Sequence, residues 1–476
     1  MPSPDGGGPT PSVNEVASAA RGSDGRPTRI AFLSYSSGEF DARTFRMARS
    51  AIEAGYDVTV YARWHRGLAP VEQRDGYRLV RASWEWQLGV PILRRRARRR
   101  IAAAMAQAAR GVEPAGIGAA RATPPSAGLA QRIRRARPFE RWHWWVRVRE
   151  FLLRPRGWAA ALQEVVEPAD IWHGMWVGSL PAVLATRRRL GGRAIYDSRD
   201  VFMRSREYAR LGQPGRGLLA RIERRWAGQV DRVLTVNEAY ATLLAGDLRV
   251  PRPAVVMNCP AVWTPPSPRP DLIRRALDIP TETAVILYQG RLTAERGIEQ
   301  AVEAILEVPD AILVLLGFGV LEAALAEQAS RPPYAGRVRL LPPVPPDDLL
   351  RWSASADALV MAIQPTTTNH RYTTPQKLFE AMAAGVPVVA SDLPGMAPIV
   401  QITGAGVLCD PTSPASIAAA IRHIVDAPPD EREAMRARAL RAAHERYNWE
   451  TQVETLLALY RELVPPRAVR PDPSAG

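Results

Sequence analysis

Three short segments in the C-terminal half of the chain carry residues that could bind a phosphate-bearing ligand. The first, Gly290–Gly297, follows an apolar run and leads into a helical pattern, so Arg291 and Arg296 are expected near a helix N-terminus. Gly290 permits a tight turn and a close approach of the backbone to a ligand. Guanidinium groups beside the positive end of a helix suit a diphosphate. The alternative is that both arginines are solvated on the surface of a basic protein.

The second segment is the turn Gly317-Phe318-Gly319, which follows the apolar run Ala311–Leu316. Glycines at the end of a buried strand can present backbone N–H groups to a phosphate. Many strand-to-helix turns contain glycine, so this turn alone is a weak predictor of a site.

The third segment runs from Thr373 to Glu380 and places Pro375 at the start of a helix. The unpaired N–H groups of that helix end can bind phosphate. Glu380 could accept hydrogen bonds from ribose hydroxyls, or it could be a surface carboxylate that pairs with Lys377 one turn away. Lys377 is the only lysine in the chain, which favours a specific use for its compact ammonium group.

A parallel sheet would bring these segments together. Short apolar strands alternate with amphipathic helices from Arg29–Ser34 and Asp57–Ala62 onward, and the alternation restarts at Ala284–Gln289. This order indicates an α/β fold with a parallel, doubly wound sheet in each half. Two such domains leave a cleft between the carboxyl ends of their strands, where ligands bind.

The Pro-rich stretch Pro260–Pro270 is the best candidate for an interdomain linker. The resulting division, in chain order, is a disordered tail 1–28, an N-terminal Rossmann-like domain 29–262, a linker 263–270, a C-terminal Rossmann-like domain 271–445, a closing helix 446–465 and a disordered tail 466–476.

Residues 84–158 interrupt the pattern with basic and aromatic side chains. Arg94–Arg100 reads RRRARRR beside an apolar helical stripe, and Trp142, Trp144 and Trp145 follow. With a formal net charge of +15, this segment suits an anionic bilayer surface, and we expect peripheral membrane association. The alternative is a helical excursion whose tryptophans pack on their own domain. Nucleic acid is not an expected partner, because no fold signature for it accompanies the charge.

The remaining composition predicts a cytoplasmic protein, peripheral on the inner face of the membrane. No apolar run reaches the roughly 18–20 residues that span a bilayer, and residues 1–28 contain no apolar signal-peptide core. Cys259 and Cys409 match no metal or redox spacing and are expected to be free thiols.

The segments YQGRLTAERG, LLGFG and TTPQKLFEAMAAGVPVVAS, in this order and spacing, resemble the family 4 (group 1) retaining glycosyltransferases. The resemblance covers the chain from about Arg29 to Leu463, and Asp41–Ala62 and Ala169–Ala182 contribute to it. It implies the GT-B architecture, in which two Rossmann-like domains face each other across a cleft. It also implies transfer of a hexosyl unit from a UDP- or GDP-linked sugar to an acceptor hydroxyl, without a further cofactor, in the synthesis of a surface polysaccharide or glycolipid.

The resemblance implies roles for particular residues. Arg291, Arg296, Lys377 and His173 would form the catalytic group, with His173 at the cleft. The implied donor contacts are Gly290, Gly317, Gly319, Thr373, Thr374, Leu378 and Glu380. Glu380 matches the second glutamate of the family's pair, which binds the ribose, and Tyr372 stands at the position of the first.

No Asp-x-Asp motif stands where a metal-dependent transferase would need it, so metal-independent transfer is expected. The charge of the leaving diphosphate would then be offset by the basic residues and helix N-termini. The acceptor would be a glycan or a lipid-linked molecule. Two other functions stay open: an epimerase or phosphorylase of the same architecture, and a binding protein that has lost turnover. Tyr372 and the change of the family's second cleft histidine to Met175 keep the latter open.

Overall fold

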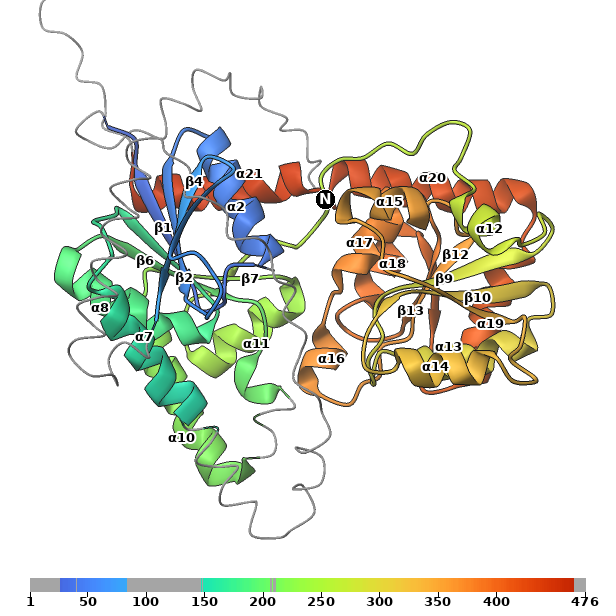
Figure 1. The fold of residues 1–476 in the computed structure, drawn as a ribbon, viewed down its shortest axis with the longest axis horizontal. Helices are drawn as coiled ribbons and strands as arrows, with labels where there is room; N and C mark the ends of the chain where they lie inside the picture. The colour runs from blue at the N-terminus through green and yellow to red at the C-terminus, as the bar shows by residue number, and fades with distance from the viewer. Residues whose placement is uncertain are drawn as a thin grey trace, which may run out of the picture.

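The computed structural model of the chain describes residues 26–39, 41–83, 147, 149–205, 208 and 211–465. It contains two domains, each built around its own sheet (Figure 1). Most of the predicted membrane segment 84–158, the predicted tail 466–476 and nearly all of the predicted tail 1–28 lie outside the described residues. None of the described helices is both long and apolar enough to cross a bilayer.

The N-terminal domain contains an eight-stranded sheet in the order β3-β4-β2-β1-β5-β6-β7-β8. Its strands are β1 Arg29–Ser34, β2 Asp57–Arg63, β3 Val71–Arg74, β4 Tyr77–Ala82, β5 Ile171–Met175, β6 Arg193–Ser198, β7 Arg232–Thr235 and β8 Ala254–Val255. All neighbouring strands pair in parallel except β3, which is antiparallel to β4 at the edge. The predicted parallel α/β sheet is therefore confirmed.

Helices cover both faces of this sheet (Figure 1). They are α2 Ala42–Glu53, α7 Arg154–Leu162, α8 Leu180–Leu190, α10 Gly212–Ala227 and α11 Glu238–Leu248, with the short π-helix η2 Arg149–Leu153 and the 3-10 helices η3 Val177–Ser179 and η4 Phe202–Arg204. Helix α2 begins after Asp41 because the carboxylate of Asp41 accepts a hydrogen bond from the backbone N–H of Thr44.

The C-terminal domain contains a six-stranded, all-parallel sheet in the order β11-β10-β9-β12-β13-β14. Its strands are β9 Ala284–Arg291, β10 Ala311–Phe318, β11 Val338–Leu341, β12 Ala358–Met361, β13 Val388–Ser391 and β14 Gly406–Cys409. Alternate residues of β9 enter separate cores: Val285 and Leu287 on one face, Ile286 and Tyr288 on the other. Helices on both faces explain why these strands are continuous apolar runs.

The helices of this domain are α12 Leu272–Leu277, α13 Ile298–Ala304, α14 Glu322–Ala329, α15 Leu349–Ser353, α16 Thr368–Tyr372, α17 Gln376–Ala383, α18 Ala397–Thr403, α19 Pro414–Val425 and α20 Pro429–Glu445, with the turns η5 Ile305–Glu307 and η6 Pro346–Asp348. Helices α16 and α17 lie on the side that faces the N-terminal domain (Figure 1).

The last helix, α21 Trp449–Leu463, leaves the C-terminal domain and packs on the N-terminal one (Figure 1). The indole N–H of Trp449 donates to the hydroxyl of Ser50 in α2, at 2.8 Å. Leu456 and Tyr460 have no exposed surface and lie in the N-terminal core. The end of the chain is therefore a structural part of the first domain.

Candidate functional site

The turns that follow β9 and β10 lie side by side and depend on glycine. Gly317 of β10 is paired with Gly290 of β9. A Cβ atom on Gly317 would lie 1.9 Å from the carbonyl oxygen of Gly290, and one on Gly319 would lie 2.2 Å from that of Leu292. No side chain fits at such distances, so these predicted glycines are required for the two turns to pack.

Arg291 and Arg296 flank the next turn. Arg291 ends β9 and is exposed, whereas Arg296 is half-buried. Within the described residues, neither guanidinium makes a hydrogen bond or an ion pair. The turn is fixed by Gly297, where φ is +74° and a Cβ atom would lie 1.8 Å from the carbonyl oxygen of Ala362. Two arginines are thus held at a defined place without a carboxylate partner.

Lys377, in the first turn of α17, approaches the same turns. Its ammonium nitrogen lies 4.0 Å from the centre of the Tyr288 ring and would be 3.5 Å from a Cβ atom on Gly290. Burial and the nearby Arg296 lower the pKa of Lys377 to about 7, although Glu380 opposes the shift. The structure therefore brings the three predicted cations to one end of β9.

Glu380 is held by amides and forms no ion pair with Lys377 among the described residues. Its carboxylate accepts hydrogen bonds from the side-chain amides of Gln289 and Gln376, each at 2.8 Å. Burial raises the pKa of Glu380, while these amide donors and Lys377 act in the opposite direction. The arrangement fixes the carboxylate and leaves lone pairs for a hydroxyl donor.

The other predicted donor contacts occupy different environments. Thr374 donates its hydroxyl to the carbonyl oxygen of Gly395 at 2.6 Å, and Thr373 lies in the extended link before α17. Helix α17 begins after Pro375 with no side-chain cap. The side chain of Leu378 is fully buried in the core, so Leu378 supports the helix and its side chain does not line the cleft.

The structure places His173 inside the N-terminal domain, not at the cleft surface. Its side chain has no exposed area, its ring stacks on Phe32, and Nδ1 lies 2.8 Å from the hydroxyl of Tyr460. Burial lowers the pKa of His173 to about 3, despite the neighbouring Asp197. This neutral, enclosed imidazole anchors α21, and its position does not support the predicted contact with substrate.

The carboxyl ends of β1, β5 and β6 form the wall of a pocket of about 400 Å³ on the N-terminal side. It is lined by Ser34, Tyr35, Ser36, Ser37, Asp41, Met175, Trp176, Arg199 and Asp200. The sequence did not predict this pocket, although Met175 stands at a position of the family's cleft histidines. The available signal was that its residues directly follow the predicted strands.

Trp176 is the most unusual residue of this N-terminal pocket. It has φ of 77°, a conformation that bulky residues rarely adopt. Its indole stacks with Tyr35 at a ring distance of 6.1 Å and meets Phe202 edge-on at 4.9 Å. Strain of this kind persists only where the surroundings hold it, and it is common at functional sites.

The charge of Arg199 is neutralised within the same pocket. Its guanidinium donates to the carboxylate of Asp41 at 2.7 Å and to the hydroxyl of Thr44 at 2.8 Å. Burial alone would raise the pKa of Asp41, but Arg199 and neighbouring hydroxyl donors lower it to about 2. The pocket wall also carries the hydroxyl of Ser36 and the carboxylate of Asp200, which accepts a hydrogen bond from the side-chain amide of Asn369 at 3.5 Å.

The two domains are connected beside these residues by Asn369 of α16. Its side-chain carbonyl accepts from the backbone N–H of Val201 at 3.0 Å, and its backbone carbonyl accepts from the hydroxyl of Tyr240 at 2.9 Å. Asn258 also donates to the side chain of Gln376, at 2.7 Å. The cation cluster and the N-terminal pocket are thus held in one interdomain arrangement.

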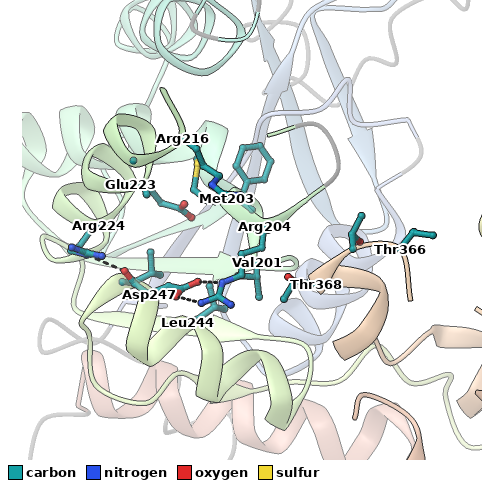
Figure 2. A pocket seen from close by; sticks show the side chains of 15 residues that line it. Val201, Met203, Arg204, Arg216, Glu223, Arg224, Leu244, Asp247, Thr366 and Thr368 are labelled. Carbon is teal, nitrogen blue, oxygen red and sulfur yellow. Dashed lines mark hydrogen bonds and ion pairs between the residues drawn. The ribbon is translucent and has the colours of Figure 1, made fainter. Parts of the chain in front are cut away.

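A second pocket, of about 570 Å³, is lined by residues of both domains, among them those of η4 (Figure 2). Arg204 forms a bidentate pair with Asp247, and Thr366 and Thr368 contribute from the C-terminal domain. Glu223 is buried, accepts a hydrogen bond from Tyr196 at 2.9 Å, and has its pKa raised to about 7 by burial. Because both domains line it, this pocket is an extension of the interdomain region.

Two Rossmann-like domains with parallel sheets define the GT-B architecture, as predicted. The family model "Glycosyl transferases group 1" matches residues 270–442, which contain all the predicted donor-side residues.

The curated relatives are similar over less than half of this chain. A glycogen synthase from Mycobacterium tuberculosis is 30% identical over 188 residues, covering 38% of this chain and 43% of that protein. A D-inositol 3-phosphate glycosyltransferase from Xylanimonas cellulosilytica is 30% identical over 220 residues, covering 44% of this chain and 50% of that protein. The chain therefore spans about half the length of the curated relatives that it matches.

Solved structures match over nearly the whole chain at low sequence identity. Sucrose-phosphate synthase from Thermosynechococcus elongatus superposes with a TM-score of 0.65 and 16% identity, covering 92% of this chain and 99% of that one. Anabaena Alr3699/HepE in complex with UDP gives a TM-score of 0.60 and 15% identity, covering 92% and 100%. At this identity the similarity establishes the fold.

Proposed function

We propose that this protein is a glycosyltransferase that takes a sugar from a nucleoside-diphosphate sugar. The observation that carries the proposal is the convergence of Arg291, Arg296 and Lys377 on the glycine turns after β9 and β10. A cluster of cations without ion-pair partners in the described chain suits a diphosphate. The match of residues 270–442 to the group 1 family model supports the same assignment.

The proposed donor carries UDP or GDP. Anabaena Alr3699/HepE, which shares the fold, is a UDP complex, and this supports UDP as the first nucleotide to test. Glu380 would accept hydrogen bonds from the ribose, because Gln289 and Gln376 hold its carboxylate in place. Backbone N–H groups near Thr373 and Thr374 would contact the transferred sugar, since Tyr372 cannot supply the carboxylate of the family's first glutamate.

The proposed reaction retains the anomeric configuration and uses no metal. The acceptor hydroxyl would attack from the face that the diphosphate leaves, and a diphosphate oxygen would take its proton. The bond from the anomeric carbon to the diphosphate breaks, and a bond to the acceptor oxygen forms. Arg291, Arg296 and Lys377 would stabilise the charge that develops on the leaving group.

The proposed acceptor binds in the N-terminal pocket, with its hydroxyl directed toward the cation cluster. Tyr35 and Trp176 provide stacked aromatic surface, and Ser36 and Asp200 can hydrogen-bond to hydroxyl groups. This chemistry fits a glycan or the sugar of a lipid-linked acceptor.

A role in making a surface polysaccharide or glycolipid fits such an acceptor. The enzyme would then work as a peripheral protein on the inner face of the membrane, bound through residues 84–158.

A turnover assay tests the proposal. The protein would be given UDP- and GDP-linked hexoses with glycan and lipid-linked acceptors, in buffer with and without EDTA, while nucleoside diphosphate release and the anomeric configuration of the product are measured. We expect EDTA-resistant release that needs an acceptor, a product that retains the donor's configuration, and at least about a hundredfold loss in Arg291→Ala.

Turnover of Arg291→Ala within a few-fold of wild type would show the charge assignment to be wrong. Nucleotide binding without any turnover would favour the second candidate, a GT-B binding protein. That alternative rests on Tyr372 at the position of a family glutamate and on the burial of His173.

A further inference from the structure

A hollow of about 480 Å³ lies between α7, α8 and α10 of the N-terminal domain. It shares no lining residue with the two pockets of the interdomain region. Leu184 and Trp226, both buried, form part of its apolar floor. We call this hollow the three-helix groove.

Each of the three helices contributes one exposed arginine to the three-helix groove: Arg156 from α7, Arg188 from α8 and Arg225 from α10. The residues that line the groove include no aspartate or glutamate. Arg156 lies over the indole of Trp226 at 5.5 Å and donates one hydrogen bond to the carbonyl oxygen of Leu152. Within the described residues, the guanidinium groups of Arg188 and Arg225 have no hydrogen bond or ion pair.

The positive charge of the three-helix groove is not compensated by any of the residues that line it. Most other arginines on the same helices are engaged: Arg187 pairs with Asp231, and Arg154 pairs with Glu150. Three guanidiniums that converge from separate helices over an apolar floor therefore form a site for an anion, most naturally a phosphate.

Two exposed leucines accompany the arginines. Leu153 is 61% exposed and Leu218 is 47% exposed. Leu153 directly precedes α7, one turn before Arg156, and Leu218 lies two turns before Arg225 on α10, so each shares a helix face with a groove arginine. A soluble phosphate compound would bind the arginines but would not bury the exposed leucines, whereas an anionic bilayer binds cationic and apolar groups together.

We propose that the three-helix groove binds the phosphate of an anionic phospholipid headgroup, with Leu153 and Leu218 entering the apolar boundary of the bilayer. This inference rests on the proposed peripheral membrane association, and it places a specific headgroup site on helices that the structure describes. Leu153 and Arg156 belong to the end of segment 84–158, so the groove continues the surface already expected to meet the membrane.

Vesicle co-sedimentation tests this site. The full chain would be mixed with vesicles of phosphatidylcholine alone, or with about 30% phosphatidylglycerol, a fraction that gives an anionic surface. The triple variant R156Q/R188Q/R225Q should lose about tenfold or more in partitioning to the anionic vesicles. The matched control R339Q/R351Q/R441Q removes three exposed arginines of the C-terminal domain and should partition like wild type.

Equal loss in both triple variants would overturn the site and leave only general attraction by net charge. Thermal stabilisation of wild type by inorganic phosphate that is lost in the groove variant, with vesicle binding unchanged, would instead identify a soluble anion as the ligand. If the protein does not bind the vesicles and a phosphopeptide competes with inorganic phosphate for the groove, the ligand would instead be a phosphorylated polypeptide. The double variant R188Q/R225Q, which keeps the contact of Arg156 with Trp226, separates loss of binding from loss of folding.

Nucleotide binding is measured on the same samples. Groove variants should keep the thermal shift given by UDP or GDP, so a failure of the groove and a failure of the transferase proposal are distinguishable. If the wild-type protein does not bind anionic vesicles, the groove proposal is refuted, whether or not UDP or GDP stabilises the protein.

Discussion

Lys377 shows how the proposed donor site is arranged at the level of single residues. Its ammonium lies against the ring of Tyr288, near Arg296, and this environment lowers its pKa to about 7. The cluster therefore disfavours its own positive charge until an anion arrives. A diphosphate placed between these groups would stabilise the charged ammonium and raise the pKa of Lys377.

Nucleotide binding should accordingly be linked to proton uptake. At pH 8 the free protein holds Lys377 mostly neutral, so binding of UDP or GDP should take up close to one proton. At pH 5.5 the ammonium is already charged, and uptake through Lys377 should vanish. Above pH 7 the affinity should fall by up to about tenfold per pH unit, until the pKa of the bound state is reached. Calorimetry in two buffers of different ionisation enthalpy measures the uptake.

The variants Lys377→Gln and Arg291→Lys provide the comparison for this proton linkage. Uptake at pH 8 should disappear in Lys377→Gln and persist in Arg291→Lys, which keeps both the charge and Lys377. A wild-type protein that binds nucleotide at pH 8 with no proton uptake would contradict the placement of the diphosphate beside Lys377.

The residues that the structure brings to the end of β9 could be predicted to lie together because they occupy turns with glycines and a helix start, and such turns leave local signals in the sequence. It failed where position depends on packing between distant segments. His173 follows the pattern of a strand end, but the arrival of Tyr460 from α21 encloses it. The stacking of Trp176 on Tyr35 likewise joins two different strand ends, so neither residue alone predicted a pocket.

At the scale of elements, the turn after β9 depends on a close approach between neighbouring strands. Gly297 has φ of +74°, and a Cβ atom there would lie 1.8 Å from the carbonyl oxygen of Ala362, which follows β12. Gly336 also has a positive φ, of +81°, but a Cβ atom there would meet nothing within 4 Å. Alanine substitutions at the two glycines can therefore distinguish the free-energy cost of a left-handed backbone conformation from that of a steric clash.

We expect Gly336→Ala to destabilise the protein by about 1 kcal/mol, the usual cost of a left-handed alanine. Gly297→Ala should cost about 3 kcal/mol or more, because the turn must also move away from Ala362. Denaturant unfolding measures both values. Gly297→Ala should also weaken nucleotide binding, since Arg296 is its neighbour. Equal free energies of unfolding for the two variants would show that the close approach is not a constraint.

The main strands were predictable because buried parallel strands read as short apolar runs between helical patterns. Strand β3, with the sequence VEQR at the edge of the sheet, has no such run and was not predicted. The short helix α16 was also missed, although its cap is local: the hydroxyl of Thr367 accepts from the backbone N–H of His370. Its importance lies in Asn369, whose partners belong to the other domain.

In the whole molecule, α21 links the two domains, because the end of the chain follows the C-terminal domain and packs into the core of the N-terminal one. The amphipathic pattern of residues 446–465 predicted a closing helix, but an apolar stripe does not say which sheet it covers. In the structure Leu456 lies fully buried among residues of β1, β5 and α2. The N-terminal core is therefore completed only when residues after the C-terminal domain have folded back.

Leu456→Ala should destabilise the N-terminal domain by about 2–5 kcal/mol, the range for a large cavity in a core. Leu313, equally buried in the C-terminal core, gives the matched control Leu313→Ala. In thermal unfolding of Leu313→Ala, nucleotide should raise the unfolding temperature of the C-terminal domain. In Leu456→Ala, nucleotide should leave the unfolding temperature of the N-terminal domain unchanged. A nucleotide-sensitive N-terminal transition in Leu456→Ala would contradict the assignment of the donor site to the C-terminal domain.

Nucleotide-dependent thermal stability tests whether the end of β9 binds a nucleoside diphosphate. UDP, GDP, ADP and CMP would be compared on wild type, Arg291→Ala and the remote control Arg339→Ala. A nucleotide at about 100 times its dissociation constant should stabilise the fold by about 2.7 kcal/mol. We expect selective stabilisation by one nucleoside diphosphate, kept in Arg339→Ala and lost in Arg291→Ala. No stabilisation by any nucleotide, or an equal shift in Arg291→Ala, would contradict it.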